Sequence, residues 1–296
     1  MSAKLCLIDS AGALALRRNE TAFGCPRNFL DNRFVYVVVS PRARGLSIGI
    51  NMNPDRFCNF DCVYCEVNRE LPAVESELDV SVMAAELRRT LELIASGRIR
   101  EHPAFRGLSD DLIRMRHVAF SGDGEPTLAA RFADAVQAVV HVRARRQPFF
   151  KVVLITNGTG LDLPEVQHNL KYFTRDDEIW IKLDAGSQAY MDRVNRSEVA
   201  LQKVFDNALL VGRHRPIIIQ SLFPRIGGEE PAQTEIDAYV GLLKQLKDGG
   251  AQISLVQIYS ATRPSSKADC EHLPLKTLSR ISQQIKTQTG LKAEVF

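Results

Sequence analysis

The chain has 296 residues, of which 45% are hydrophobic and 25% are charged, so it can bury a large core. Its formal net charge of +3 gives no strong indication of a nucleic-acid partner, although arginines gather at 42–44, 88–89 and 143–146. Apolar runs stay well short of the roughly 20 residues that a membrane helix needs, and the first ten residues lack the apolar stretch of a secretory signal. We therefore expect neither a membrane protein nor a secreted one.

Hydrophobic periodicity predicts six strands that alternate with helices. The expected strands cover residues 46–51, 115–120, 151–155, 179–183, 217–222 and 253–258. The expected helices cover residues 80–94, 127–143, 163–173, 187–210, 235–246 and 275–286. Alternating strands and helices form a parallel sheet with right-handed crossovers. The pattern predicts an α/β fold: an incomplete (β/α)6 TIM-like barrel over residues 46–296, with a short N-terminal extension, residues 1–45, packed on it.

Polar and glycine residues follow the carboxyl ends of several expected strands. They occupy residues 121–125, residues 156–158 and Asp184. In barrels the loops at this edge converge on one mouth, where active sites lie. We expect one site there.

Three of the six cysteines lie in the loop after the first expected strand of the barrel. Cys58, Cys62 and Cys65 have Cys-x3-Cys-x2-Cys spacing. Three thiols can hold three irons of a [4Fe–4S] cube and leave the fourth iron open for chemistry. A structural zinc ion usually takes four protein ligands, and no histidine lies nearby. A fully ligated, inert cluster would need a fourth ligand from Cys25 or elsewhere. We favour the open cluster in a reducing, cytoplasmic compartment, where clustered thiols bind metal more often than they pair.

The order of the motifs resembles that of radical S-adenosylmethionine (SAM) enzymes. The motifs are the cysteine loop and residues 122–126, 156–158, 182–184 and 257–259. More narrowly, residues 40–51 and 58–65 resemble the Fe–S oxidoreductase branch that includes the wyosine-forming tRNA enzymes, and the likeness runs from about residue 34 to about residue 264. The resemblance implies two cofactors, a [4Fe–4S] cluster and SAM, and a one-electron donor such as flavodoxin or ferredoxin. It also implies reductive cleavage of SAM to methionine and a 5′-deoxyadenosyl radical, which takes a hydrogen atom from a substrate.

The resemblance also assigns roles near the cluster and the methionine end of SAM. It makes Tyr64 a neighbour of the adenine, and it directs Gly122, Gly124 and Glu125 toward the methionine amino group. The cluster ligands that it implies are Cys58, Cys62 and Cys65.

Other residues are expected to contact the ribose, the carboxylate of SAM or the substrate. Thr156, Asn157 and Asp184 are candidates for the ribose hydroxyls. Lys182 pairs with the methionine carboxylate or binds substrate, and it is the candidate catalytic residue. The same pocket is expected to include Gln220 and Tyr259.

The substrate class stays open between a small molecule, a tRNA base and a peptide. Wyosine-forming enzymes use three further cysteines upstream of the triad for a second cluster that works with pyruvate. This chain has only Cys6 and Cys25 upstream, so we expect a single cluster. The alternatives to this hypothesis are a wyosine-type tRNA-modifying enzyme and a non-catalytic iron–sulfur or zinc sensor.

Overall fold

The computed structural model describes residues 21–24, 29–73, 75–146, 148–261 and 270–296. The strands are β1 (Val35–Ser40), β2 (Gly45–Asn51), β3 (Met115–Ser121), β4 (Lys151–Thr156), β5 (Glu178–Lys182), β6 (Ile217–Leu222), β7 (Arg225–Ile226), β8 (Ile253–Tyr259), β9 (Cys270–Glu271) and β10 (Ala293–Val295). The α-helices are α1 (Val80–Ala95), α2 (Asp110–Ile113), α3 (Phe132–Ala144), α4 (Pro164–Asn169), α5 (Gln188–Val194), α6 (Leu201–Gly212), α7 (Gln233–Asp248) and α8 (Leu275–Thr289). Short 3-10 helices cover Phe29–Asp31, Arg98–Glu101, Pro126–Leu128 and Leu170–Tyr172.

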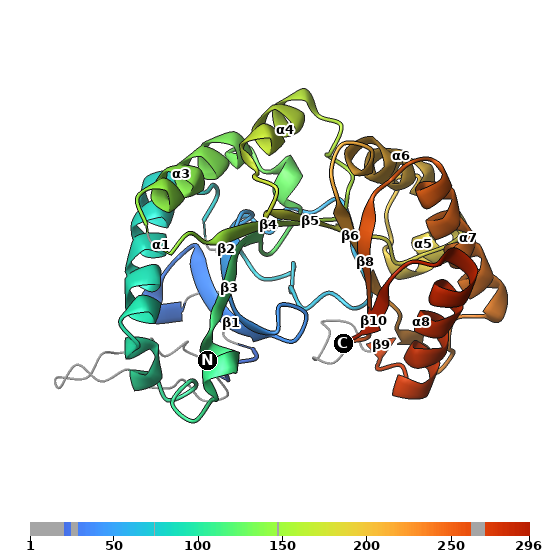
Figure 1. Ribbon diagram of the computed structural model, residues 1–296, viewed down its shortest axis with the longest axis horizontal. Coiled ribbons are helices and arrows are strands. Elements are labelled where there is room, and N and C mark those ends of the chain that lie inside the picture. Colours follow the sequence, from blue (N-terminus) through green and yellow to red (C-terminus); the bar gives the residue numbers. More distant parts are fainter. Residues whose placement is uncertain (1–20, 25–28, 74, 147, 262–269) are drawn as a thin grey trace.

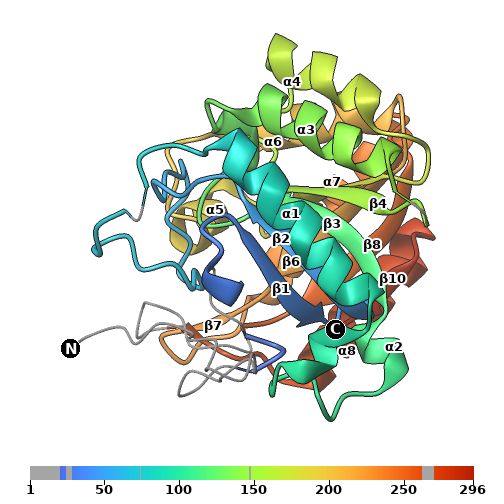
Figure 2. The ribbon, with the colours of Figure 1, turned by 90° about the vertical axis from the view of Figure 1, so that its left-hand side faces the viewer.

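One curved sheet runs through the molecule in the order β1-β2-β3-β4-β5-β6-β8-β10. All neighbouring pairs are parallel except β1 with β2. Figure 1 shows the long helices in an arc on the outer side of this sheet, and Figure 2 shows α1 and α3 side by side on one flank. Each of the six expected strands is present, and a helix follows each one. The predicted incomplete barrel is therefore confirmed.

Strand β1 adds an antiparallel edge to the barrel, within the stretch expected as an N-terminal extension. Its register runs from Val35 opposite Ile50 to Ser40 opposite Gly45. The ring of Tyr36 crosses Gly49 so closely that a Cβ there would lie 2.0 Å from it. Residues 1–20 and 25–28 of the expected extension lie outside the described residues, so its packing stays a prediction.

The two faces of the sheet differ in composition because successive side chains of a strand point to opposite faces. The outer face packs against the helices in the main core, with Ile48, Val118 and Leu154 fully buried. The inner face carries a small apolar group and several polar side chains. That apolar group is Ala119, Val153, Trp180 and Ile218.

Two expected helices differ from those observed. The stretch expected as one helix over residues 187–210 is two helices, α5 and α6, because Arg196 takes a left-handed φ of 47°. The helix expected from residue 127 begins at Phe132, since Thr127 lies in a short 3-10 helix and its backbone N–H donates to the carboxylate of Glu125. No helix among the described residues has both the length and the apolar character to cross a membrane.

A buried ion pair joins α3 to the amino ends of β4 and β5. The Arg143 Nη1 atom lies 2.8 Å from both carboxylate oxygens of Asp177. The same carboxylate accepts the backbone N–H groups of Val152 and Thr174, each at 2.7 Å. Every acceptor site of Asp177 is thus used inside the fold, as buried charges require.

Candidate active site

The loop that carries the three cysteines follows β2 and is fixed to two other parts of the site edge. The backbone N–H groups of Asp61 and Val63 donate to the carbonyls of Asn195 and Val194, at the end of α5, at 2.9 and 2.8 Å. On the other side, a Cβ at Gly124 would lie 1.8 Å from the carbonyl oxygen of Phe57. Only glycine allows this approach. Gly124 therefore lets the loop after β3 lie directly against the cysteine loop.

None of the three cysteines forms a disulfide, and each sulfur accepts a hydrogen bond or lies beside a donor. The Phe60 backbone N–H lies 3.5 Å from Cys58 Sγ, the Asn195 amide 3.3 Å from Cys62 Sγ, and the Arg69 guanidinium 3.2 Å from Cys65 Sγ. Burial raises the pKa of Cys58 to about 12 and that of Cys62 to about 11. Iron binding would supply the positive charge that turns such thiols into thiolates.

Three thiols from one loop are the ligand set that a cube with one open iron takes. A [4Fe–4S] cube takes one thiolate per iron, so its ligands stand apart at separate corners. The fourth described cysteine, Cys270, lies on β9 and is also a free thiol. Cys6 and Cys25 lie outside the described residues.

Asp184, directly after β5, is the centre of a hydrogen-bond network beside the cysteines. Its Oδ2 atom accepts from the hydroxyl of Tyr64 and from the amide of Asn195, the latter at 3.0 Å. Its Oδ1 atom accepts the backbone N–H of Leu222 at 2.8 Å. Burial and the Asp184 carboxylate both raise the pKa of Tyr64, which keeps it a neutral phenol that donates. The network links the cysteine loop, β5 and β6.

Lys182 points into the barrel two residues before Asp184. Its Nζ atom donates to the hydroxyl of Tyr259 at 3.0 Å and lies 3.5 Å from Asp184 Oδ1. It also lies 4.8 Å from the centre of the Tyr64 ring. Burial would lower the pKa of Lys182, but the Asp184 carboxylate and Tyr259 raise it overall, so the ammonium form persists. Arg42, from the turn between β1 and β2, stacks on the other ring, that of Tyr259, at 4.3 Å.

Glu125 is buried and fully engaged by neighbouring groups. Its Oε1 atom accepts from the backbone N–H and hydroxyl of Thr127 and from the hydroxyl of Thr156. Its Oε2 atom accepts the backbone N–H of Asn157 at 2.6 Å. Burial raises the pKa of Glu125 even though these hydrogen bonds lower it. The carboxylate thus joins the end of β3 to the end of β4.

The remaining expected residues lie on the same edge or just below it. Gly122 has φ +127°, and a Cβ there would lie 2.2 Å from Asn51 Oδ1. Asn157 donates to Asn59 of the cysteine loop at 2.8 Å. Gln220 is opposite Lys182 in register and donates to Gln257 at 2.9 Å on the inner face.

The structure gathers all the expected residues at the carboxyl edge of the sheet or on its inner face, but in two groups. One is the Lys182–Asp184–Tyr64–Tyr259 network beside the thiols, and the other is centred on Glu125. Several further residues contact these groups, the loop after β3 or the thiols but were not among the expected site residues. These are Arg42, Asn51, Asn59, Arg69 and Asn195. The only sequence signal for Asn195 is its type, since asparagine is common where helices end.

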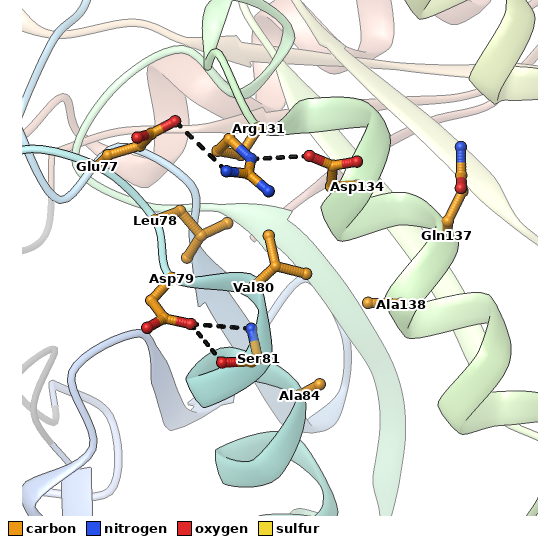
Figure 3. A pocket seen from close by; sticks show the side chains of 10 residues that line it. All are labelled: Glu77, Leu78, Asp79, Val80, Ser81, Ala84, Arg131, Asp134, Gln137 and Ala138. Carbon is orange, nitrogen blue, oxygen red and sulfur yellow. Dashed lines mark hydrogen bonds and ion pairs between the residues drawn. The ribbon is translucent and has the colours of Figure 1, made fainter.

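Two hollows elsewhere contain none of the expected residues. A groove of about 720 Å³ lies on the outer surface between α1 and α3 (Figure 3). There, Arg131 pairs with Asp134 at 2.7 Å and with Glu77 at 3.9 Å, while Asp79 caps α1. A smaller hollow of about 420 Å³ lies beside α5 and the start of α7. Their linings have acidic surface side chains but no thiol.

Several curated proteins are similar in sequence to this chain. The chain is 23% identical over 241 residues to a UPF0026 protein of Helicobacter pylori, covering 78% of this chain and 67% of that one. It is 25% identical over 240 residues to the UPF0026 protein slr1464 of Synechocystis, covering 78% and 76%. A third match, to UPF0026 protein MJ1312 of Methanocaldococcus jannaschii, is 24% identical over 173 residues and spans 58% of this chain but only 47% of that one.

Solved structures share the fold. Streptococcus suis SuiB bound to S-adenosylmethionine has a TM-score of 0.59 at 13% identity and covers 86% of this chain, which spans about half (51%) of SuiB. TYW1 with a lysine-pyruvate adduct bound has a TM-score of 0.57 at 13% identity, covering 88% and 85% of the two chains. The Radical SAM superfamily profile matches residues 52–230, which begin just before the cysteine loop and continue past β6. With that match over most of its barrel and the thiols at the barrel's carboxyl edge, the chain belongs to the Radical SAM superfamily, whose cofactors are a [4Fe–4S] cluster and SAM.

Proposed function

We propose that this chain is an enzyme that cleaves SAM reductively with a single [4Fe–4S] cluster and takes a hydrogen atom from a substrate. The proposal is supported above all by the three thiols Cys58, Cys62 and Cys65 in one loop, with Cys62 linked through Asn195 to Asp184 and so to Lys182. When bound, the cluster supplies the electron that splits the sulfonium of SAM into methionine and a 5′-deoxyadenosyl radical. We assign the following roles to the chain's own residues.

Lys182 suits the carboxylate of SAM or of a substrate. Its ammonium is held by Asp184 at 3.5 Å and by Tyr259 at 3.0 Å, which leaves donor capacity for an anion. The hydroxyl of Tyr259 accepts from Lys182, so its own proton is still available to donate. Arg42 adds a second positive charge on the far face of the Tyr259 ring.

The group around Glu125 suits the polar ends of SAM through its backbone and its amides. The loop after β3 lies against Asn51 at Gly122 and against Phe57 of the cysteine loop at Gly124, and we assign its backbone carbonyls to the methionine ammonium. Thr156, Asn157 and Asp184 remain our candidates for the ribose hydroxyls, and Tyr64 for the adenine. Gln220 on the inner face, whose amide bonds to Gln257, completes the proposed pocket.

A wyosine-type reaction is the rival within the superfamily, because TYW1 has the same fold and was solved with a lysine-pyruvate adduct. Imine formation needs a neutral amine. The raised pKa of Lys182 keeps it an ammonium, which favours anion binding over nucleophilic attack. Incubation with pyruvate and borohydride should therefore leave the mass of the Lys182 peptide unchanged. A trapped adduct on Lys182 would favour the rival.

We further propose a separate one-electron donor, such as flavodoxin or ferredoxin, and a cytoplasmic location. The support is chemical. A low-potential cluster must be reduced from outside, and none of the four described cysteines is in a disulfide.

Anaerobic reconstitution tests the proposed function directly. The protein should bind about four irons per chain and release 5′-deoxyadenosine from SAM on reduction with dithionite. Cys58→Ala, Cys62→Ala and Cys65→Ala should abolish the cluster, while Cys270→Ala, the matched free thiol on β9, should retain it. Stoichiometric zinc without SAM cleavage would favour a sensor instead.

A further inference from the structure

Two side chains outside the recognised motifs donate to the sulfur atoms of the proposed cluster ligands. Asn195 Nδ2 lies 3.3 Å from Cys62 Sγ, and Arg69 Nη1 lies 3.2 Å from Cys65 Sγ. Resting on the proposed function, we infer that Asn195 and Arg69 raise the reduction potential of the cluster and so set how readily it accepts the electron.

Asn195 is fixed from both sides, so its amide is directed at the sulfur rather than free to turn away. It is the residue that ends α5, where its backbone N–H donates to the carbonyl of Met191 at 2.7 Å. Its own carbonyl accepts the N–H of Asp61 from the cysteine loop at 2.9 Å. The side chain is buried, and Nδ2 also donates to Asp184 at 3.0 Å.

Arg69 brings a full positive charge to the opposite end of the triad. Besides Cys65, its guanidinium donates to the backbone carbonyls of Asp123 at 3.3 Å and Arg56 at 3.3 Å. Arginine cannot lose its proton in a protein, so this charge is permanent. The side chain is half-buried, which limits the screening of the charge by water and salt.

The sign of the effect follows from charge. Reduction adds an electron to the cube and its thiolates, and donors to the sulfurs stabilise the more negative state. The full charge of Arg69 should act more strongly than the neutral dipole of Asn195. By contrast, Cys58 has a backbone donor, the N–H of Phe60, at 3.5 Å.

A redox titration followed by electron paramagnetic resonance tests this inference on the reconstituted full chain. Arg69→Gln and Asn195→Ala should move the midpoint potential to more negative values, with the larger shift for Arg69→Gln. Arg69→Lys, which keeps the charge, should restore most of the potential. Arg56→Gln is the matched control, since the Arg56 guanidinium donates to the carbonyls of Asn68 and Leu71 in the same loop and not to a thiolate.

The outcomes separate the inference from the proposed function. An unchanged potential in both variants, or an equal shift in Arg56→Gln, would overturn the inference and leave SAM cleavage untouched. Failure of both variants to take up iron would show that the two residues only hold the loop, and would also overturn it. Failure of the unaltered protein to bind iron would instead count against the proposed function.

Discussion

Two buried ion pairs lie at the two ends of β5, and they are built differently. At the amino end, Arg143 and Asp177 are almost fully buried, with an N–O distance of 2.8 Å. At the carboxyl end, the Lys182 and Asp184 atoms are 3.5 Å apart, and the Lys182 side chain is 18% exposed. The first pair is tight and closed to solvent, whereas the second is loose and partly open.

The difference lies in where the spare hydrogen-bonding capacity is. Asp177 is saturated by Arg143 and by backbone and side-chain donors, so nothing is left for a ligand. Asp184 is held by Tyr64, Asn195 and Leu222, and Lys182 retains one N–H donor beyond its contacts with Asp184 and Tyr259. One strand therefore carries a pair that holds the fold and a pair that presents a cation to a ligand.

The largest effect should come from breaking the closed pair. Arg143→Met leaves the Asp177 charge buried without its cation, and this typically costs about 3–5 kcal/mol of unfolding free energy. Urea denaturation of the purified protein measures the loss. The folded fraction should still bind a cluster, because Arg143 lies at the opposite end of β5. A loss below about 1 kcal/mol would show that the pair does not hold the fold.

Glu125 is a motif residue that either holds the fold, as the Arg143–Asp177 pair does, or contacts a ligand, as we propose for Lys182. Glu125→Ala leaves the buried N–H groups of Thr127 and Asn157 without acceptors, at a cost of about 1–3 kcal/mol each. We expect unfolding free energy to fall by at least about 2 kcal/mol, with weaker SAM binding as a consequence. Glu125→Gln, which keeps one acceptor oxygen, should lose less of both. Unchanged stability with a large loss of SAM affinity would instead make Glu125 a direct ligand.

Lys182→Met should have the opposite signature, changing binding more than stability. Asp184 keeps its donors from Tyr64, Asn195 and Leu222, and its contact with Lys182 is longer than the contact between Arg143 and Asp177, so unfolding free energy should fall by less than in Arg143→Met. A hydrogen bond to a charged group contributes about 1.5–3 kcal/mol, so SAM affinity should fall about tenfold to a hundredfold. Trp180, the single tryptophan, lies on the same inner face and gives a fluorescence readout. Lys182→Arg keeps the charge and should bind SAM more tightly than Lys182→Met. If the two variants bound SAM equally well, the charge at position 182 would not contribute to SAM binding.

The sequence predicted the six barrel strands because their apolar runs are long and end in polar, glycine-containing segments. It did not predict β7 and β9, since two-residue strands have no periodicity to detect. The β-branched residues of β1 are typical of a strand, but its place at the edge of the sheet depends on its antiparallel pairing with β2. The break between α5 and α6 lies at the left-handed Arg196, beside the contact of the Asn195 carbonyl with the cysteine loop, and periodicity contains neither feature.

For the site, the motifs predicted which residues meet at the carboxyl edge, but not what each one contacts. Glu125 appeared as a ligand for an ammonium, yet its oxygens bond to Thr127, Thr156 and Asn157. Asn195 lies 133 residues from Cys62, so only the folded chain shows their contact. Spacing identifies side chains that share a loop, whereas pairing across the barrel depends on the tertiary fold.

His117 gives the smallest expected effect, because it is a buried base that bonds to a neutral hydroxyl. It bonds to Ser47 at 2.9 Å and packs against Trp180, and burial, with a contribution from Lys151, lowers its pKa from 6.5 to about 3. Between these two values the unfolded chain binds a proton that the native state does not, so unfolding free energy falls as pH drops below about 6.5.

The slope expected from this one group approaches about 1.4 kcal/mol per pH unit well below the unfolded pKa. Urea denaturation at pH 7, 6 and 5 should show His117→Gln losing less stability on acidification than the unaltered protein, since glutamine can still bond to Ser47 but takes no proton. All other titrating groups are common to both proteins and cancel in the difference. Parallel pH profiles would mean that His117 takes up its proton within the fold as readily as in the unfolded chain, and would contradict the lowered pKa.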